Sequence, residues 1–128
     1  MKTVDDLYSL TKTIMFEKPS SVIYDNYLIG NVNRVIRELF DENNMERMFN
    51  GKEPLAEPPY VTQKTDELVY EDLYLNEIMP LGLAAYFLID DDLSKYQIYI
   101  TDYKNARIMN QKIVSQEVID GFTGNTEL

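Results

Sequence analysis

Cysteine, histidine and tryptophan are absent from this chain of 128 residues. Without cysteine there are no disulfides, no thiol nucleophiles and no thiolate metal ligands. Without histidine the chain lacks the usual general base near neutral pH and the commonest transition-metal ligand. The lack of cysteine also suits a reducing cytoplasm. These absences remove most of the side chains that enzymes use for nucleophilic and metal-assisted chemistry.

The motifs of common nucleotide-binding and hydrolytic sites are also missing. The sequence contains no GxxxxGK[ST], GxGxxG, GxSxG or HExxH. Carboxylates are plentiful, but none stands alone within an apolar stripe, where burial would raise its pKa. Glu77 and Asp66 come nearest, and both are better explained as helix-start residues. We therefore expect no catalytic residue, no cofactor and no metal, with a paired-carboxylate enzyme as an alternative.

Basic residues are few: 12 Lys and Arg stand against 22 Asp and Glu, a net charge of -10. Binding to phosphates requires clustered Lys and Arg, so the composition argues against nucleic-acid binding and against an anionic membrane surface. It favours a solvated acidic surface, a basic partner, or a surface along which DNA passes without being held.

No hydrophobic run is long enough to cross a bilayer. The longest, Ile78 to Ile89, is too short and is closed by three aspartates, residues 90–92. The N-terminus has polar residues where a signal peptide would have an apolar run. These features predict a soluble protein with one domain.

The same apolar run predicts the centre of the fold. A helix that is apolar nearly all round is buried in a soluble domain. We predict a central helix over about residues 77–90, capped by Asn76. Pro80 then lies in its first turn, where the missing N–H costs little.

Three other segments have apolar residues at helical spacing. The first runs from Val4 to Met15 with Thr3 as its N-cap, and the second from Ser20 or Ser21 to about residue 44, or as far as Phe49. The last runs from Ser94, as its cap, to about Ser115. Gly30 inside the second helix indicates either a close helix crossing or a tolerated glycine.

The remaining segments are predicted to be extended. Prolines stiffen a connection over about residues 50–64, in which residues 60–62 form either a short strand or a surface loop. Residues 65–68 resemble a capping signal before a short turn or helix. The overall prediction is a mainly α, four-helix-bundle-like domain over residues 1–115. The tail, residues 116–128, contains a possible short strand and is ordered by a partner.

Aspartates 90–92 and the ten tyrosines each allow two interpretations. The aspartates suggest a calcium site, but the DxDxDG pattern is absent, and a polar corner between two helices is the alternative. Tyrosines suit wet interfaces between subunits, and the alternative places most of them at the edge of the core.

The order of these features resembles the small helical head-to-tail connector (adaptor) proteins of tailed bacteriophages and prophages. The resemblance covers nearly the whole chain and is carried by a series of phrases in order: TVDDL (3–7), NRVIRELFDEN (33–43), TDEL (65–68), LGLAAYFL (81–88) and the tyrosine-bearing helix 96–107. Each phrase alone is a weak motif. Their agreement in order carries the resemblance.

The resemblance implies a structural role in the virion at the head–tail junction, after assembly from the host cytoplasm. Copies would form a ring below the portal, extend the DNA channel and bind a portal or tail protein, with DNA passing nearby. The alternative is a soluble acidic phage protein, such as a DNA-mimic inhibitor or an assembly factor. Candidate subunit or partner contacts are Tyr60, Tyr96, Tyr99, Arg107, Val118 and Phe122.

Overall fold

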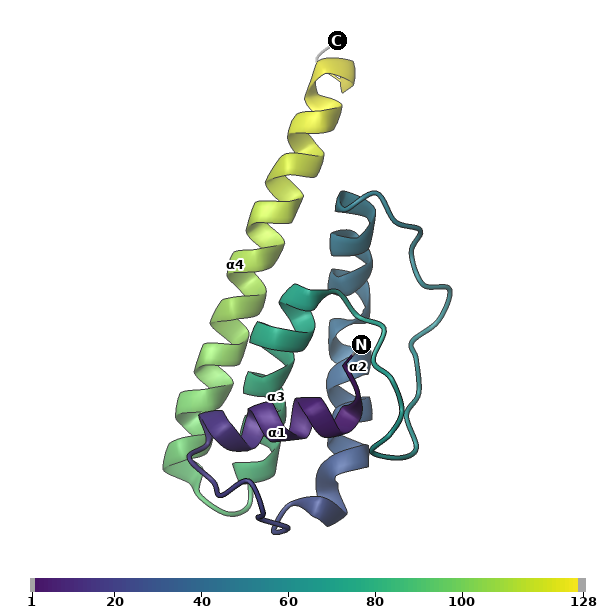
Figure 1. Cartoon of the computed structure of the whole chain (residues 1–128). Helices are drawn as coiled ribbons and strands as arrows, with labels where there is room; N and C mark the ends of the chain where they lie inside the picture. Colours follow the sequence, from purple (N-terminus) through teal and green to yellow (C-terminus); the bar gives the residue numbers. More distant parts are fainter. Residues whose placement is uncertain (1, 127–128) are drawn as a thin grey trace.

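The computed structural model describes the backbone of residues 2–126 and the side chains of residues 2–111. Its elements are α1 (Val4–Ile14), α2 (Asp25–Phe49), the π-helical turn η1 (Tyr74–Ile78), α3 (Met79–Leu88) and α4 (Leu93–Thr126). Helix α3 lies between α2 and α4, and α1 crosses the bundle beside it (Figure 1). The predicted mainly α fold around a buried central helix is confirmed.

Helix α3 is the core of the molecule because it has almost no polar side chain to present to water. Every residue of α3 except Leu81 is buried. At Gly82 the neighbouring helix α4 comes so close that an added Cβ would lie 2.7 Å from the ring of Tyr103. The glycine therefore lets α3 and α4 pack in contact at this point.

The start of the central helix differs in part from the prediction. Pro80 lies in the first turn of α3, as expected, but Asn76 is inside η1 and is not a cap. The helical segment begins earlier because the side chain of Asn43 supplies a cap from α2. Its Oδ1 accepts the backbone N–H of Glu71 at 2.8 Å.

The caps of the other helices were predicted with mixed success. Thr3 and Asp6 form a reciprocal capping box at the start of α1, as expected. Ser20 and Ser21 do not cap α2, which begins at Asp25. The backbone carbonyl of Ser21 instead accepts a hydrogen bond from Lys12 Nζ, so the loop is tied to α1.

The corner before α4 uses an aspartate where a serine cap was predicted. Asp92 Oδ1 accepts the backbone N–H of Lys95 at 3.1 Å, so Asp92, not Ser94, caps α4. The N–H groups of Asp91 and Asp92 both return to the carbonyl of Leu88. This tight turn places Asp92 where its side chain reaches the first turn of α4.

The connection between α2 and η1 is extended, as predicted, but residues 60–62 form no strand. Val61 pairs with a side chain, because its N–H and carbonyl both bond the amide of Asn33 at 2.9 Å. Residues 65–68 form no helix. Glu67 instead makes an antiparallel bridge with Thr3, and the carbonyls of Lys64 and Asp66 accept the first two N–H groups of α1.

Helix α4 is longer than predicted. It continues through Thr126, so the expected end near Ser115 is wrong, and the tail has helical backbone where a short strand was suggested. Val114, Val118 and Phe122 recur every four residues, a helical spacing that the two nearby glycines obscured. Whether a partner orders this tail stays a prediction. Among the described residues, no helix is both long and apolar enough to cross a membrane.

Candidate functional site

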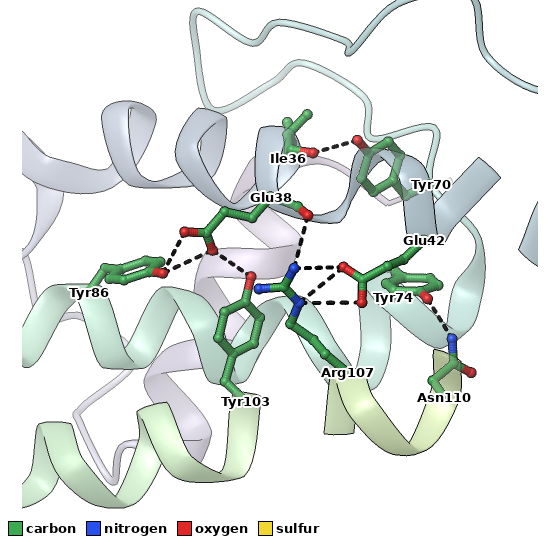
Figure 2. Close-up of polar contacts among 9 residues, drawn as sticks. All are labelled: Ile36, Glu38, Glu42, Tyr70, Tyr74, Tyr86, Tyr103, Arg107 and Asn110. Carbon is green, nitrogen blue, oxygen red and sulfur yellow. Dashed lines mark hydrogen bonds and ion pairs between the residues drawn. The ribbon is translucent and has the colours of Figure 1, made fainter. Parts of the chain in front are cut away.

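A polar network joins α2, α3 and α4 (Figure 2), and Glu38 on α2 is at one end of it. Its carboxylate accepts hydrogen bonds from the hydroxyl of Tyr86 on α3, at 2.6 Å, and from that of Tyr103 on α4, at 2.7 Å. The guanidinium of Arg34 lies over the ring of Tyr86, 3.7 Å from its centroid. One carboxylate thus holds a side chain from each of the two other helices.

Arg107 on α4 extends the network one turn further along α2. Its Nη2 lies 2.9 Å from Oε2 of Glu42, and the same nitrogen donates to the backbone carbonyl of Glu38 at 3.2 Å. Asn110 then donates to the hydroxyl of Tyr74. Burial alone would lower the pKa of Arg107, but its bonds to Glu42 more than offset this and the pKa is raised. Arg107 and Glu42 therefore form a charged, partly buried pair.

The two phenols that bond Glu38 are protonated donors at neutral pH. Burial, together with the bond to the Glu38 carboxylate, raises the pKa of Tyr86 to about 12. The same two causes raise the pKa of Tyr103 further. Because the oxygens of Glu38 already accept two phenols, the arrangement positions helices and offers no free acid–base pair.

A second charged cluster lies at the C-terminal end of α2. Glu71, only 6% exposed, accepts hydrogen bonds from Asn50 and Lys52, and Arg47 lies 3.7 Å away. Burial would raise the pKa of Glu71, yet the bonds from Asn50 and Lys52 lower it below its usual value. A cavity of about 520 Å³ adjoins this cluster. Acidic and basic groups both line it, so it has no clear preference for an anion or a cation.

An open groove lies between the N-terminal part of α2 and the end of α3, and we call it the α2–α3 groove. Its volume is about 520 Å³. Its apolar lining includes Ile23, 63% exposed, and Tyr27, 62% exposed. Its charged lining residues are Arg34, Asp90 and Asp91. The groove has the mixed apolar and charged lining of a protein-binding surface.

The predicted contact residues fall into three groups. Tyr60 is 73% exposed, and Tyr96 is half-buried against the core. Tyr99 and Arg107 have partners within the chain, since the hydroxyl of Tyr99 donates to the carbonyl of Ile14 at 2.7 Å. Val118 and Phe122 belong to α4, but their side chains lie outside the described residues.

The tyrosines favour the interior over the surface. Of the ten, only Tyr27 and Tyr60 are exposed, and the others are buried or half-buried. Six of their hydroxyl groups donate to carboxylates or backbone carbonyls, as Tyr8 does to Asp25 and Tyr70 to the carbonyl of Ile36. Most tyrosines therefore belong to the core: six are buried, and only Tyr96 and Tyr99 have the half-buried, core-edge position that the sequence suggested for most of them.

Sequence reasoning missed Glu38 and Glu42, although the sequence contains a signal for both. Val35, Glu38 and Glu42 are spaced by three and four residues, so the two acids continue the edge of the apolar stripe of α2. Tyr103, Arg107 and Asn110 have the same kind of spacing on α4. Two matching polar edges on neighbouring helices indicate a buried contact, but the pairing itself requires the tertiary structure.

The aspartates before α4 have roles within the fold. Asp91 accepts the hydroxyl of Tyr24 at 3.1 Å, and Asp92 is the cap of α4. Over the part of the chain that the structure describes, no group of three or more acidic side chains is placed to hold a metal ion.

Comparison with known proteins returned no match to a protein-family model, a curated protein sequence or a solved structure.

Proposed function

We propose that this chain is a structural virion protein of a tailed phage or prophage. Copies of it form part of the head-to-tail connector ring below the portal and extend the DNA channel. The proposal starts from the resemblance in the order of sequence features. In the structure those features correspond to a capped short helix, a long helix, an extended crossing, a buried helix, an acidic corner and a tyrosine-bearing helix.

The projection of α4 is the observation that carries the proposal. At 34 residues this helix is about 50 Å long, and its C-terminal part extends past the rest of the bundle (Figure 1). Its N-terminal part is held firmly by Tyr103 and Arg107. A helix that is anchored at one end and projects at the other suits a subunit that reaches a neighbour or a platform protein.

The charge distribution supports a role beside DNA without binding to it. Residues 1–92 carry eight basic and eighteen acidic side chains, a net charge of -10. A surface of this kind does not neutralise phosphates, so DNA would pass along it without being held.

The alternative, a soluble acidic protein that imitates DNA, receives less support from the contacts. A mimic needs free carboxylates spaced like phosphates over one face. Glu38, Glu42 and Glu71 are instead bonded within the fold.

Mass photometry of the purified chain, alone and mixed with the portal protein encoded nearest to it, tests the proposal. We expect closed oligomers of the chain, or a stoichiometric complex with the portal. A chain with α4 shortened after Gln111 provides the comparison, because it keeps Arg107 and Asn110 while losing the projecting part. We expect this shorter chain to fold and to lose portal binding. Absence of both self-association and portal binding by the full chain would refute the proposal.

A further inference from the structure

The side of α4 that faces away from the bundle carries no charged residue within its described part. Ser94, Ile98, Thr101, Asn105 and Ile108 are spaced alternately by four and three residues, so they share one side of the helix. We call this side the α4 outer face. All five residues are exposed, with Ile98 at 59% and Ile108 at 61%. The stripe is uncharged although the chain has a net charge of -10.

Gly30 is exposed on α2 between two residues that line the α2–α3 groove. It lies between Tyr27 and Arg34 on the exposed side of α2, at spacings of three and four residues. An added Cβ at Gly30 would meet nothing within 4 Å, so no element of the same chain crosses close to it. Of the two interpretations of Gly30, a close helix crossing within the chain is therefore wrong, and a tolerated glycine is the one that remains. The bare backbone is open to an approach from outside, and glycine in mid-helix otherwise weakens α2.

The charged residues that border these two surfaces are opposite in net sign. Residues 93–111 carry three basic side chains and one acidic one, in contrast to the net charge of -10 on residues 1–92. Lys95, Lys104 and Asp102 are exposed beside the α4 outer face, and Asp90, Asp91 and Arg34 line the groove. The two surfaces share no residue, so one copy can offer both at once.

We propose that the α4 outer face of one copy packs into the α2–α3 groove of a second copy, crossing α2 at Gly30. The inference deepens the proposed function, on which it rests for the choice of a second copy as partner. Ile98 and Ile108 are the apolar anchors, and Ile23 and Tyr27 are their counterparts in the groove. The mode is a helix lying in a groove. Because the two surfaces differ, the contact is head-to-tail and generates a ring when its rotation closes.

Cross-linking tests the contact even when association is weak, since the chain contains no cysteine of its own. One variant carries Ile98→Cys and another Tyr27→Cys, both at exposed positions. Treated with a short bis-maleimide at high concentration, the mixture should give a cross-linked dimer that neither variant alone gives in comparable yield. Met48→Cys, exposed at the other end of α2, is the matched control. Equal yields with Met48→Cys, or no cross-linked dimer in the mixture, would overturn the proposal.

Substitutions then separate this inference from the proposed function. Gly30→Gln should raise the melting temperature by about 3 °C, because glutamine is the better helix former, and should weaken self-association at least tenfold. Ile98→Lys should also weaken self-association at least tenfold, whereas Met48→Lys should not. A mixture of Gly30→Gln and Ile98→Lys should form dimers and no larger species, since one intact contact remains between the two variants.

The outcomes of these experiments can be told apart. If the chain forms rings with the portal and Gly30→Gln forms them equally well, the head-to-tail contact is wrong and the connector role stands. If the chain does not bind the portal but the cysteine variants cross-link selectively, the contact stands and the connector role is wrong.

Discussion

Helix α4 packs against its two neighbours through different chemistry. Against α3 the contact is apolar and close, with the ring of Tyr103 placed directly over Gly82. Against α2 the contact is polar, through Glu38, Glu42 and Arg107. Apolar contact is non-directional and supplies most of the stability, whereas hydrogen-bonded charges require one particular geometry. The α3 contact therefore keeps α4 in the bundle, and the α2 contact fixes its position along and around its axis.

The largest expected effect comes from filling the close contact between α3 and α4. Gly82→Leu should reduce the free energy of unfolding by more than about 3 kcal/mol, because neither the Tyr103 ring nor the α4 backbone can move away cheaply. Chemical denaturation measures this change. Gly30→Ala is the matched control, and it should stabilise the protein by about 0.5–1 kcal/mol because its Cβ meets open space. Similar stability changes at both glycines would contradict the close packing of α3 and α4.

Removal of the charged partner of Arg107 should have the next largest effect. Glu42 is 4% exposed and Arg107 28% exposed. Glu42→Gln leaves a cation without its counter-charge in a half-buried place, so we expect a loss of about 2–3 kcal/mol by chemical denaturation. The double variant Glu42→Gln with Arg107→Met should recover part of that loss. If the two substitutions were simply additive, the pair would not interact.

A single phenol of the network should contribute less to stability than the Glu42–Arg107 pair does. Tyr103→Phe removes one hydrogen bond to Glu38 and leaves the ring over Gly82 in place, so we expect a loss of about 1 kcal/mol. Tyr60→Phe, at an exposed position, should leave the stability unchanged. Equal effects at the two positions would mean that the bond to Glu38 contributes nothing.

The ionisation of two buried phenols, Tyr86 and Tyr24, should have the smallest effect on stability at neutral pH and should be visible only at high pH. The pKa of Tyr86 and that of Tyr24 are each raised to about 12 by burial and by a neighbouring carboxylate. The folded state therefore holds these protons more tightly than the unfolded state, in which tyrosine has a pKa of about 10. The contribution of these two phenols to stability should be constant up to about pH 10 and be lost between pH 10 and pH 12. Thermal melts across this range measure the loss, which should be smaller in Tyr86→Phe.

Much of the fold could be predicted from local pattern. Thr3 and Asp6 cap α1 through contacts three residues apart, and α3 is buried because its own residues leave it no polar face. The prolines after Gly51 predicted an extended connection, because proline has no backbone N–H to donate and restricts the backbone angles around it. These features depend on neighbours in sequence, so the printed sequence contains the information.

Two of the errors arose where a partner distant in sequence takes over a local role. Asn76 was expected to cap the central helix, but Asn43 begins the helical segment earlier from another helix. Residues 60–62 were compatible with a strand, and the amide of Asn33 takes the place of the neighbouring strand. Secondary-structure propensity cannot identify such partners, because they depend on which helices lie side by side in the fold.

The sequence by itself determined that this protein is an acidic helical domain with a buried centre, because composition and hydrophobic period decide which segments leave water. The tertiary structure alone decided that Glu38 and Glu42 hold α4, that most tyrosines face inward, and that no element of the chain packs close to Gly30. The physical reason is that hydrogen bonds and close contacts between helices depend on distances in space. Separations along the chain do not fix those distances.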